Sequence, residues 1–189
     1  MKLYLLIFLL LTATGKGIAQ RYFLNVEKST VLWQGRAARG AYSVEGSLRP
    51  ENGFIELKPG CVIARAEISI NMKSLKTDIP RLENHLKSSD FFAVAQYPAA
   101  SFQLVPARDG QDSPRKISGW LSIKGEKNYE EVEISTSLIK EELTLRATLT
   151  LDRSRYNIFN QSDYFLNSLK EKAIHNEFTV ELNLVFESE

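Results

Sequence analysis

The chain has 189 residues, of which 24 are Lys or Arg and 23 are Asp or Glu, so its formal net charge is only +1. This balance argues against a nucleic-acid-binding protein, which needs a basic face to offset phosphate charge. The length suits one domain with a sizeable core, and a single cysteine, Cys61, cannot form a disulfide within the chain. Cys61 opens the apolar run 61–64, so we expect a buried, unreactive thiol.

The first 19 residues are predicted to be a signal peptide. Lys2 gives a positive start, residues 3–11 are uninterruptedly apolar, and Gly17 and Ala19 provide small residues before a cleavage site. The apolar run is much shorter than the roughly 20 residues that span a bilayer. We therefore expect cleavage near Ala19, a mature domain over 20–189 with a net charge near −1, and a periplasmic location. A buried N-terminal helix is the alternative.

The rest of the chain is dominated by alternation of apolar and polar residues. In 143–152, for example, every odd position is apolar and every even one polar. Such a period places one face of a strand in the core and the other in solvent. In chain order, strands are predicted at 22–27, 30–38, 42–48, 54–57, 62–72, 99–105, 117–124, 131–138, 143–152 and 178–186. Turns are predicted at 51–53, 59–60, 109–110 and 126–128.

Two stretches break the alternation. Residues 80–87, with Asp78 as the cap, are predicted to form a short helix, and a second is predicted to begin at Ser162 or Asp163. Their apolar sides are formed by Leu82, His85 and Leu86 in the first helix and by Phe165, Leu166, Leu169 and Ala173 in the second. We expect the segment 75–92 to form the rim or lid of the fold.

These strands predict an all-β fold. Strands with one apolar face must close into a barrel or stack as a two-sheet sandwich. A closed barrel is favoured because the central strands are long and several inward positions are small enough to leave room for a ligand. These small residues are Ala64, Ala66, Ala99, Gly119 and Ala147. In a sandwich, they would instead allow close sheet packing. A membrane-spanning barrel is the third interpretation, although the aromatic residues do not gather at the strand ends.

Catalytic motifs are absent from the sequence. Its two histidines are far apart, and it has no His-Glu-x-x-His motif, Gly-x-Ser-x-Gly elbow or phosphate-binding glycine loop. We therefore expect no enzymatic activity, cofactor or metal. His85 is either a hydrogen-bonded packing residue or a contact for an anionic head group, together with Lys73, Lys76, Arg81 and Lys87. The segment 152–155 is either a charged site at the rim or an ion pair that closes a strand end.

Several motifs resemble the YceI-like lipid/polyisoprenoid-binding family. They are Ser74–Thr77, His85–Phe92, Tyr97–Pro98 with Phe102, Gly119–Gly125, Leu151–Ser154 and Tyr156–Ile158. The resemblance implies a lipocalin-like closed antiparallel β-barrel of about eight strands, with one or two short helices at the rim. It also implies an exported protein that holds a lipid chain inside the barrel. The chain departs from the family at 126–129, where a threonine-rich turn is usual, and at Asn157, where the family has glycine.

The alternation and the resemblance together predict the residues that meet a lipid. The expected barrel-interior contacts are Ile68, Ile70, Phe91, Phe92, Phe102, Leu121, Ile134, Ala147, Leu149, Phe178 and Leu182, and the expected head-group or rim contacts are His85 and Arg153. The strand neighbours Ser69, Gln103, Ser122, Glu133, Thr148 and Asn183 should point outward, because a register error of one residue exchanges the faces.

The main functional hypothesis is an exported protein that carries or sequesters a polyisoprenoid, quinone-like or fatty lipid. Its partners would be the lipid and, transiently, a membrane, but not nucleic acid. Two alternatives stay open. One is an enzyme that acts on a hydrophobic small molecule inside the barrel, and the other is a filled structural barrel that works through its outer surface.

Overall fold

The fold is a closed antiparallel β-barrel whose eight strands pair in chain order, β8 returning to β1. The computed structural model describes residues 20–37, 43–106, 115–159 and 174–188. The strands are β1 (Gln20–Ala37), β2 (Ser43–Lys58), β3 (Val62–Thr77), β4 (Ala99–Leu104), β5 (Lys116–Ile123), β6 (Glu126–Ile139), β7 (Glu142–Asp152) and β8 (Ile174–Ser188); α1 (Pro80–Lys87) follows β3 and the 3-10 turn η1 (Arg153–Tyr156) follows β7. The predicted barrel is confirmed, and pairing of β1 with β8 excludes the sandwich.

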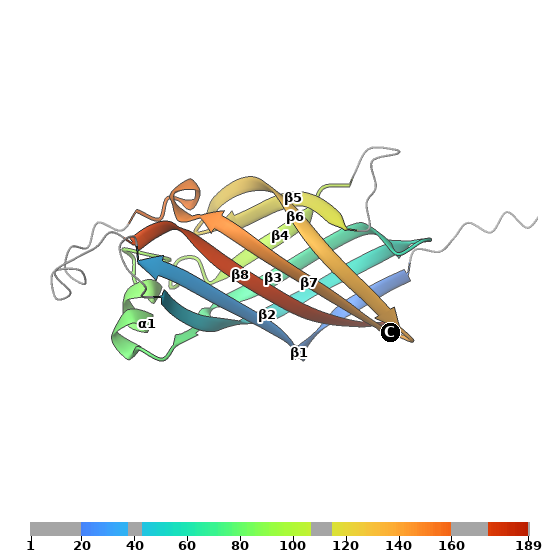
Figure 1. Ribbon diagram of the computed structural model, residues 1–189, viewed down its shortest axis with the longest axis horizontal. Coiled ribbons are helices and arrows are strands. Elements are labelled where there is room, and N and C mark those ends of the chain that lie inside the picture. Colours follow the sequence, from blue (N-terminus) through green and yellow to red (C-terminus); the bar gives the residue numbers. More distant parts are fainter. Residues whose placement is uncertain (1–19, 38–42, 107–114, 160–173, 189) are drawn as a thin grey trace, which may run out of the picture.

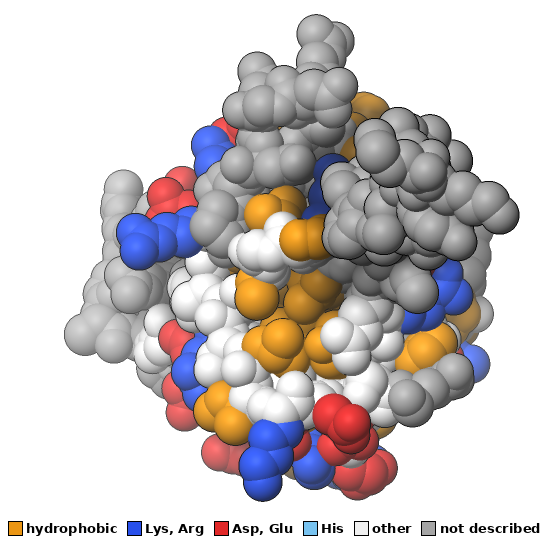
Figure 2. Space-filling view, turned by 90° about the vertical axis from the view of Figure 1, so that its right-hand side faces the viewer, with side chains coloured by type: hydrophobic (Ala, Val, Ile, Leu, Met, Phe, Trp, Pro, Cys, Tyr) orange, Lys and Arg blue, Asp and Glu red, His pale blue; other side chains and the backbone are white. Residues whose placement is uncertain are grey.

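The two ends of the barrel differ (Figure 1). One end, here called the helix end, carries α1 and η1. The other, the closed end, is filled by Tyr22, Leu143 and Phe186, each at most 1% exposed. Figure 2 shows this end, with hydrophobic side chains gathered at the centre of a ring of backbone and polar atoms. No helix within the described ranges is long and apolar enough to cross a bilayer.

Strand β1 is longer than predicted because it continues through a bulge. Its register with β8 shifts between Asn25 and Thr30. Ser29 bridges the irregularity: its hydroxyl donates to the carbonyl of Asn25 at 2.7 Å and accepts from the amide of Val185 at 2.9 Å. These side-chain hydrogen bonds replace ladder bonds, so the two predicted strands 22–27 and 30–38 are one bent strand.

Strand β2 likewise merges two predicted strands, so the predicted turn at 51–53 is wrong. These residues lie inside β2, at a register shift against β3 between Pro50 and Asn52. Gly53 permits close approach here, since a Cβ on it would lie 2.7 Å from the carbonyl oxygen of Glu67. A bulge rather than a turn therefore explains the polar Asn-Gly pair.

Two further predictions about turns are corrected. Cys61 is exposed, not buried, because it ends the turn at 59–61 with a φ of 59°, next to Gly60 with a φ of 85°. The hairpin between β5 and β6 turns at Lys124 and Gly125, both of positive φ, and the predicted turn residues 126–128 already belong to β6. Two consecutive positive φ angles match the twist of a two-residue hairpin.

Helix α1 forms over the predicted residues 80–87, but Asp78 is not its cap. Ile79 holds the N-cap position without a side-chain hydrogen bond, and Pro80 supplies a pre-set φ for the first turn. Leu82 and Leu86 are buried and pack with Leu75 and Phe91 in a core cluster at the helix end. The second predicted helix lies outside the described residues.

Candidate functional site

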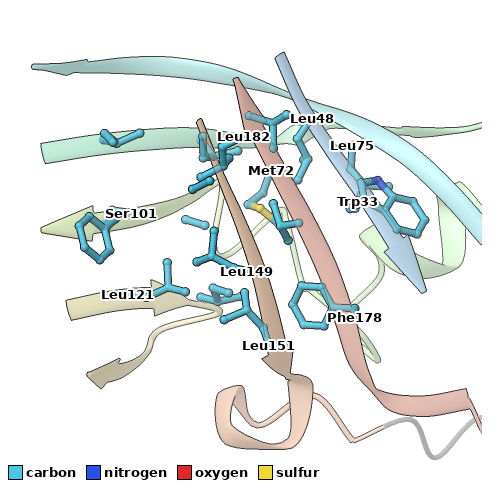
Figure 3. A pocket seen from close by; sticks show the side chains of 18 of the residues that line it. Trp33, Leu48, Met72, Leu75, Ser101, Leu121, Leu149, Leu151, Phe178 and Leu182 are labelled. Carbon is cyan, nitrogen blue, oxygen red and sulfur yellow. The ribbon is translucent and has the colours of Figure 1, made fainter. Parts of the chain in front are cut away.

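An apolar cavity of about 180 Å³ runs inside the barrel. All eight strands contribute to its wall, together with Leu82 and Leu86 of α1 and the following Phe91 and Phe92. Figure 3 shows such side chains converging on the space from several strands, among them Leu121, Leu149 and Phe178. The cavity reaches the helix end, while the layer of Tyr22, Leu143 and Phe186 at the closed end does not line it.

The strand register places the wall residues in rows across the sheet. Ile68 pairs with Phe102, which pairs with Leu121, across β3, β4 and β5. A second row runs over Ile134, Ala147, Leu182 and Val31, across β6, β7, β8 and β1. Because side chains alternate between faces, each row in register presents one continuous apolar surface to the interior.

The residues predicted as lipid contacts all line this cavity. They are Ile68, Ile70, Phe91, Phe92, Phe102, Leu121, Ile134, Ala147, Leu149, Phe178 and Leu182. Of their predicted outward neighbours, Gln103, Glu133 and Thr148 are exposed. Period two was enough to assign these faces, because the strands that carry them keep their register through the segments concerned.

Only some of the five small residues that were predicted to point inward line the cavity. Ala66 and Ala147 line the cavity and make room in it. Ala64 does not line it, since the register of β3 with β2 shifts beside it, and Ala99 is exposed while its neighbour Ala100 lines the wall. Gly119 is covered by the ring of Phe102, which occupies the place of a Cβ. Only some of the predicted small inward positions therefore create space.

Trp33 is a wall residue that the sequence analysis missed. It lies in β1 on the same face as Val31 and Gly35, so the alternation within 30–38 carried the signal. Its indole Nε1 is buried, and it finds no hydrogen-bond partner among the described residues. Other wall residues outside the predicted set of lipid contacts are Val44, Met72, Leu75 and Val180. The indole N–H is therefore a donor available to a hydrogen-bond acceptor.

Charged side chains reach the cavity at the helix end. Arg153 is 9% exposed and lines the wall, as does the exposed Glu177 of β8. The Nη1 atom of Arg153 donates to the carbonyl of Ile158 at 3.2 Å, and its guanidinium carbon lies 5.9 Å from the ring centroid of Phe91. Burial lowers the pKa of Arg153 although nearby Asp152 opposes this, and arginine stays charged at neutral pH.

His85 is half-buried and lies outside the cavity wall. Its ring packs edge-on against Phe91, with a centroid distance of 6.0 Å. Its carbonyl accepts from the amide and the hydroxyl of Ser88, which ends the helix. His85 thus supports a wall residue, and this arrangement favours the packing role over the head-group contact.

The turn η1 closes a gap in the barrel wall. Pairing of β6 with β7 begins only at Ile134 and Ala147, so the first half of β6 is not hydrogen-bonded to β7. Tyr156 lies against that half and donates from its hydroxyl to Glu130 at 2.8 Å, and Arg155 pairs with the same carboxylate at 2.7 Å. Burial, then the bond to Glu130, raise the pKa of Tyr156. An ion pair at a strand end, one alternative for 152–155, is present.

Asp152 shapes the same turn. Its carboxylate accepts from the amide of Ser154 at 2.8 Å and from the Ser154 hydroxyl at 2.7 Å. These hydrogen bonds lower the pKa of Asp152. Asn157 ends the turn in the left-handed conformation, with a φ of 53°. Asparagine tolerates this conformation, which explains how it can stand where the family has glycine.

Comparisons with known proteins agree with this geometry. The chain is 30% identical to a UPF0312 protein of Enterobacter sp. (strain 638) over 121 residues and 29% identical to the protein YceI of Salmonella newport (strain SL254) over 120 residues. Each match covers 61% of this chain and 61% of the relative, so the chain matches about three fifths of the length of these curated relatives.

Two solved structures share the fold. BcnA of Burkholderia cenocepacia matches with a TM-score of 0.66 at 19% identity, over 86% of this chain and 98% of that one. A polyisoprenoid-binding domain from Saccharophagus degradans matches with a TM-score of 0.67 at 14% identity, over 90% and 99%. The model of the YceI-like domain matches residues 22–186, which include part or all of each of the eight strands. The chain therefore belongs to the YceI-like domain family.

Proposed function

We propose that this protein binds a lipid with a long apolar chain inside its barrel and acts as an exported carrier or sequestering protein, not as an enzyme. The observation that carries the proposal is the cavity itself, whose wall is built from apolar side chains of all eight strands. Burying apolar surface is worth about 25 cal/mol per Å², so an alkyl or isoprenoid chain gains strongly from this space. A polyisoprenoid or quinone-like tail is the preferred ligand.

The orientation of the ligand follows from the difference between the ends. The closed end is sealed by fully buried side chains, so the apolar tail points there. The polar head lies at the helix end, beside the positive charge of Arg153 and the buried indole N–H of Trp33. The indole N–H, which finds no partner among the described residues, favours a head group that carries an oxygen acceptor.

The enzyme alternative called for a polar inward residue near His85 with a strongly shifted pKa. Arg153 lines the cavity there and its pKa is lowered, but arginine stays charged at neutral pH and is a poor general acid or base, and the His85 ring contacts Phe91 and does not line the cavity. The filled-barrel alternative is disfavoured by the cavity volume of about 180 Å³. The polyisoprenoid-binding domain from Saccharophagus degradans, which shares the fold, supports the choice of ligand class.

Native mass spectrometry of protein isolated from its own envelope tests the proposal. We expect a bound species whose mass matches an isoprenoid or other long-chain lipid enriched in the organic extract. The delipidated protein should then rebind an isoprenoid quinone in a titration. A protein that is always empty, with an extract no richer than the control, would refute the proposal. A periplasmic location is proposed with it, and cell fractionation together with N-terminal sequencing of the exported form tests that part.

A further inference from the structure

An exposed aromatic pair stands on the outer wall of the barrel near the helix end. Trp120 of β5 and Tyr129 of β6 are direct cross-strand partners, 40% and 45% exposed. Their ring centroids are 5.4 Å apart, and the ammonium of Lys127 lies 5.4 Å from the centroid of the Trp120 ring. Trp120, Lys127 and Tyr129 are here called the aromatic patch. The cross-strand contact stabilises the hairpin, but it leaves a large part of both rings in solvent, side by side and next to a cation.

The hairpin end of the aromatic patch is weakly cationic. Farther from the helix end, Glu131 is paired with Lys116 at 2.5 Å, Glu130 is paired with Arg155, and the exposed Glu133 lies opposite Lys116 in the strand register. At the hairpin turn itself, the exposed Lys127 and the nearby Lys124 outnumber one exposed acid, Glu126. The strand neighbours of the patch, Gln103 and Ser122, are neutral. The patch therefore combines amphipathic rings with a small excess of positive charge.

The ring geometry selects among partners. The planes of Trp120 and Tyr129 meet at 77°, so they form no flat platform on which a sugar ring or a base would stack. Trp and Tyr rings with a neighbouring lysine suit the boundary between lipid head groups and acyl chains, because each side chain has an apolar body and a polar tip. Anionic head groups complement the lysine charge.

The aromatic patch also lies near the helix end, which the cavity reaches. The inward neighbours of Trp120 along β5, Leu121 and Ile123, line the cavity. The adjacent turn η1 is tied to the same hairpin, since Asn128 donates to the carbonyl of Arg155 at 2.7 Å and Lys124 to that of Asn157 at 3.1 Å. Phe159, just beyond η1, is 57% exposed.

We propose that the aromatic patch docks the barrel onto an anionic phospholipid bilayer with its helix end beside the membrane. The inference rests on the proposed function, because docking would let a lipid pass between the bilayer and the cavity without crossing water. Docking itself requires no bound ligand, so the two proposals are tested separately.

Co-sedimentation with vesicles of equimolar phosphatidylethanolamine and phosphatidylglycerol tests docking. The wild-type protein should bind, and the Trp120→Ala/Tyr129→Ala variant should lose about tenfold in partition because both interfacial rings are removed. The matched control is Leu138→Ala/Ile139→Ala, which removes two side chains that are 38% and 69% exposed near the closed end and should bind as the wild type does. Lys127→Glu, which keeps both rings, should weaken binding to these vesicles and covers the case in which the double variant fails to fold.

Tryptophan fluorescence gives a second readout, because the chain has two tryptophans. In a Trp33→Phe background, the emission of Trp120 should shift to the blue on vesicle addition and be quenched by brominated lipid. Absence of vesicle binding, or equal binding by the wild type and both patch variants, overturns the inference even if delipidated protein still takes up ligand from solution. If the wild type does not bind vesicles and the patch variants instead lose binding to an envelope protein, the patch belongs to a protein partner. That result also overturns the inference.

Discussion

Trp33 of β1 covers Gly46 of β2, its cross-strand partner, so closely that a Cβ on Gly46 would lie 2.7 Å from the indole ring. The same Cβ would collide with the carbonyl oxygen of Lys76, where β3 rejoins β2 after a shift in register. Glycine is required here because a large wall residue and a neighbouring backbone both occupy the place of a side chain. The close packing on Gly46 fixes the position of the indole in the cavity wall.

Gly46→Ala should therefore destabilise the protein by roughly 1–3 kcal/mol, because backbone cannot move aside as a flexible side chain can. Gly35→Ala is the matched control in the preceding strand, since its Cβ would make an ordinary contact of 3.5 Å with Val44. The control should change stability little or raise it by about 0.4–1 kcal/mol through the unfolded state. Urea unfolding of both variants measures the difference, and equal stabilities would contradict the close approach.

Trp33→Phe should weaken binding of a ligand with an oxygen-bearing head group by about 0.5–1.5 kcal/mol, the net worth of one neutral hydrogen bond. The variant keeps an aromatic ring in the wall but removes the buried indole N–H. A hydrocarbon of similar length without a head group is the control ligand, and its affinity should change less. Titration of delipidated protein compares the two; an equal loss for both ligands would show that packing, not the donor, matters.

Ala147→Trp should block lipid uptake while the protein stays folded, because Ala147 lines the cavity between its row neighbours Ile134 and Leu182 and a large ring there would fill ligand space. Thr148→Trp, one residue on and exposed, is the control and should bind normally. Binding and melting temperature are measured together. Normal binding and normal stability in Ala147→Trp would show that Ala147 borders no usable cavity, whereas a loss of stability of about 1–3 kcal/mol would indicate overpacking.

His85→Ala should lower the melting temperature and leave the lipid affinity per folded molecule intact. The reason is that the His85 ring supports Phe91 from outside the cavity and does not reach the ligand space. Phe91→Ala, which removes a wall residue itself, is the comparison and should reduce both quantities. Weakened binding at unchanged stability in His85→Ala would reassign this residue to the head group.

Tyr156→Phe should cost about 1.5–3 kcal/mol at neutral pH through loss of the hydrogen bond to the Glu130 carboxylate. The substitution should also change how the free energy of unfolding depends on pH in the alkaline range. The pKa of Tyr156 is raised in the folded protein, so its contribution is present below the unfolded pKa near 10 and falls as pH rises above it. The variant should therefore lose less stability than the wild type above about pH 10. Unfolding curves of both proteins at several alkaline pH values measure this difference. The variant should still lose some stability with rising pH because the pKa of Tyr22 is raised as well.

Alternation along single strands was enough to predict the inward faces, because period two is a local property of the backbone. It predicted inward faces for Ile68, Phe102 and Leu149, and these residues line the cavity. The same reasoning failed where the chain leaves a regular strand. Ala64 sits at a register shift and Cys61 in a turn, and neither event is visible in a local apolar pattern.

The tertiary structure decided what distant segments do to one another. Ala66 and Ala147 line the cavity, whereas Gly119 does not, because the ring of Phe102 on the neighbouring strand lies over it. The packing of η1 and α1 against the barrel end likewise decides that Arg153 is buried and that His85 lies outside the cavity wall. Composition and periodicity determined the barrel and its apolar interior, whereas volume and charge at each point of the cavity were set by long-range packing, which no short stretch of sequence encodes.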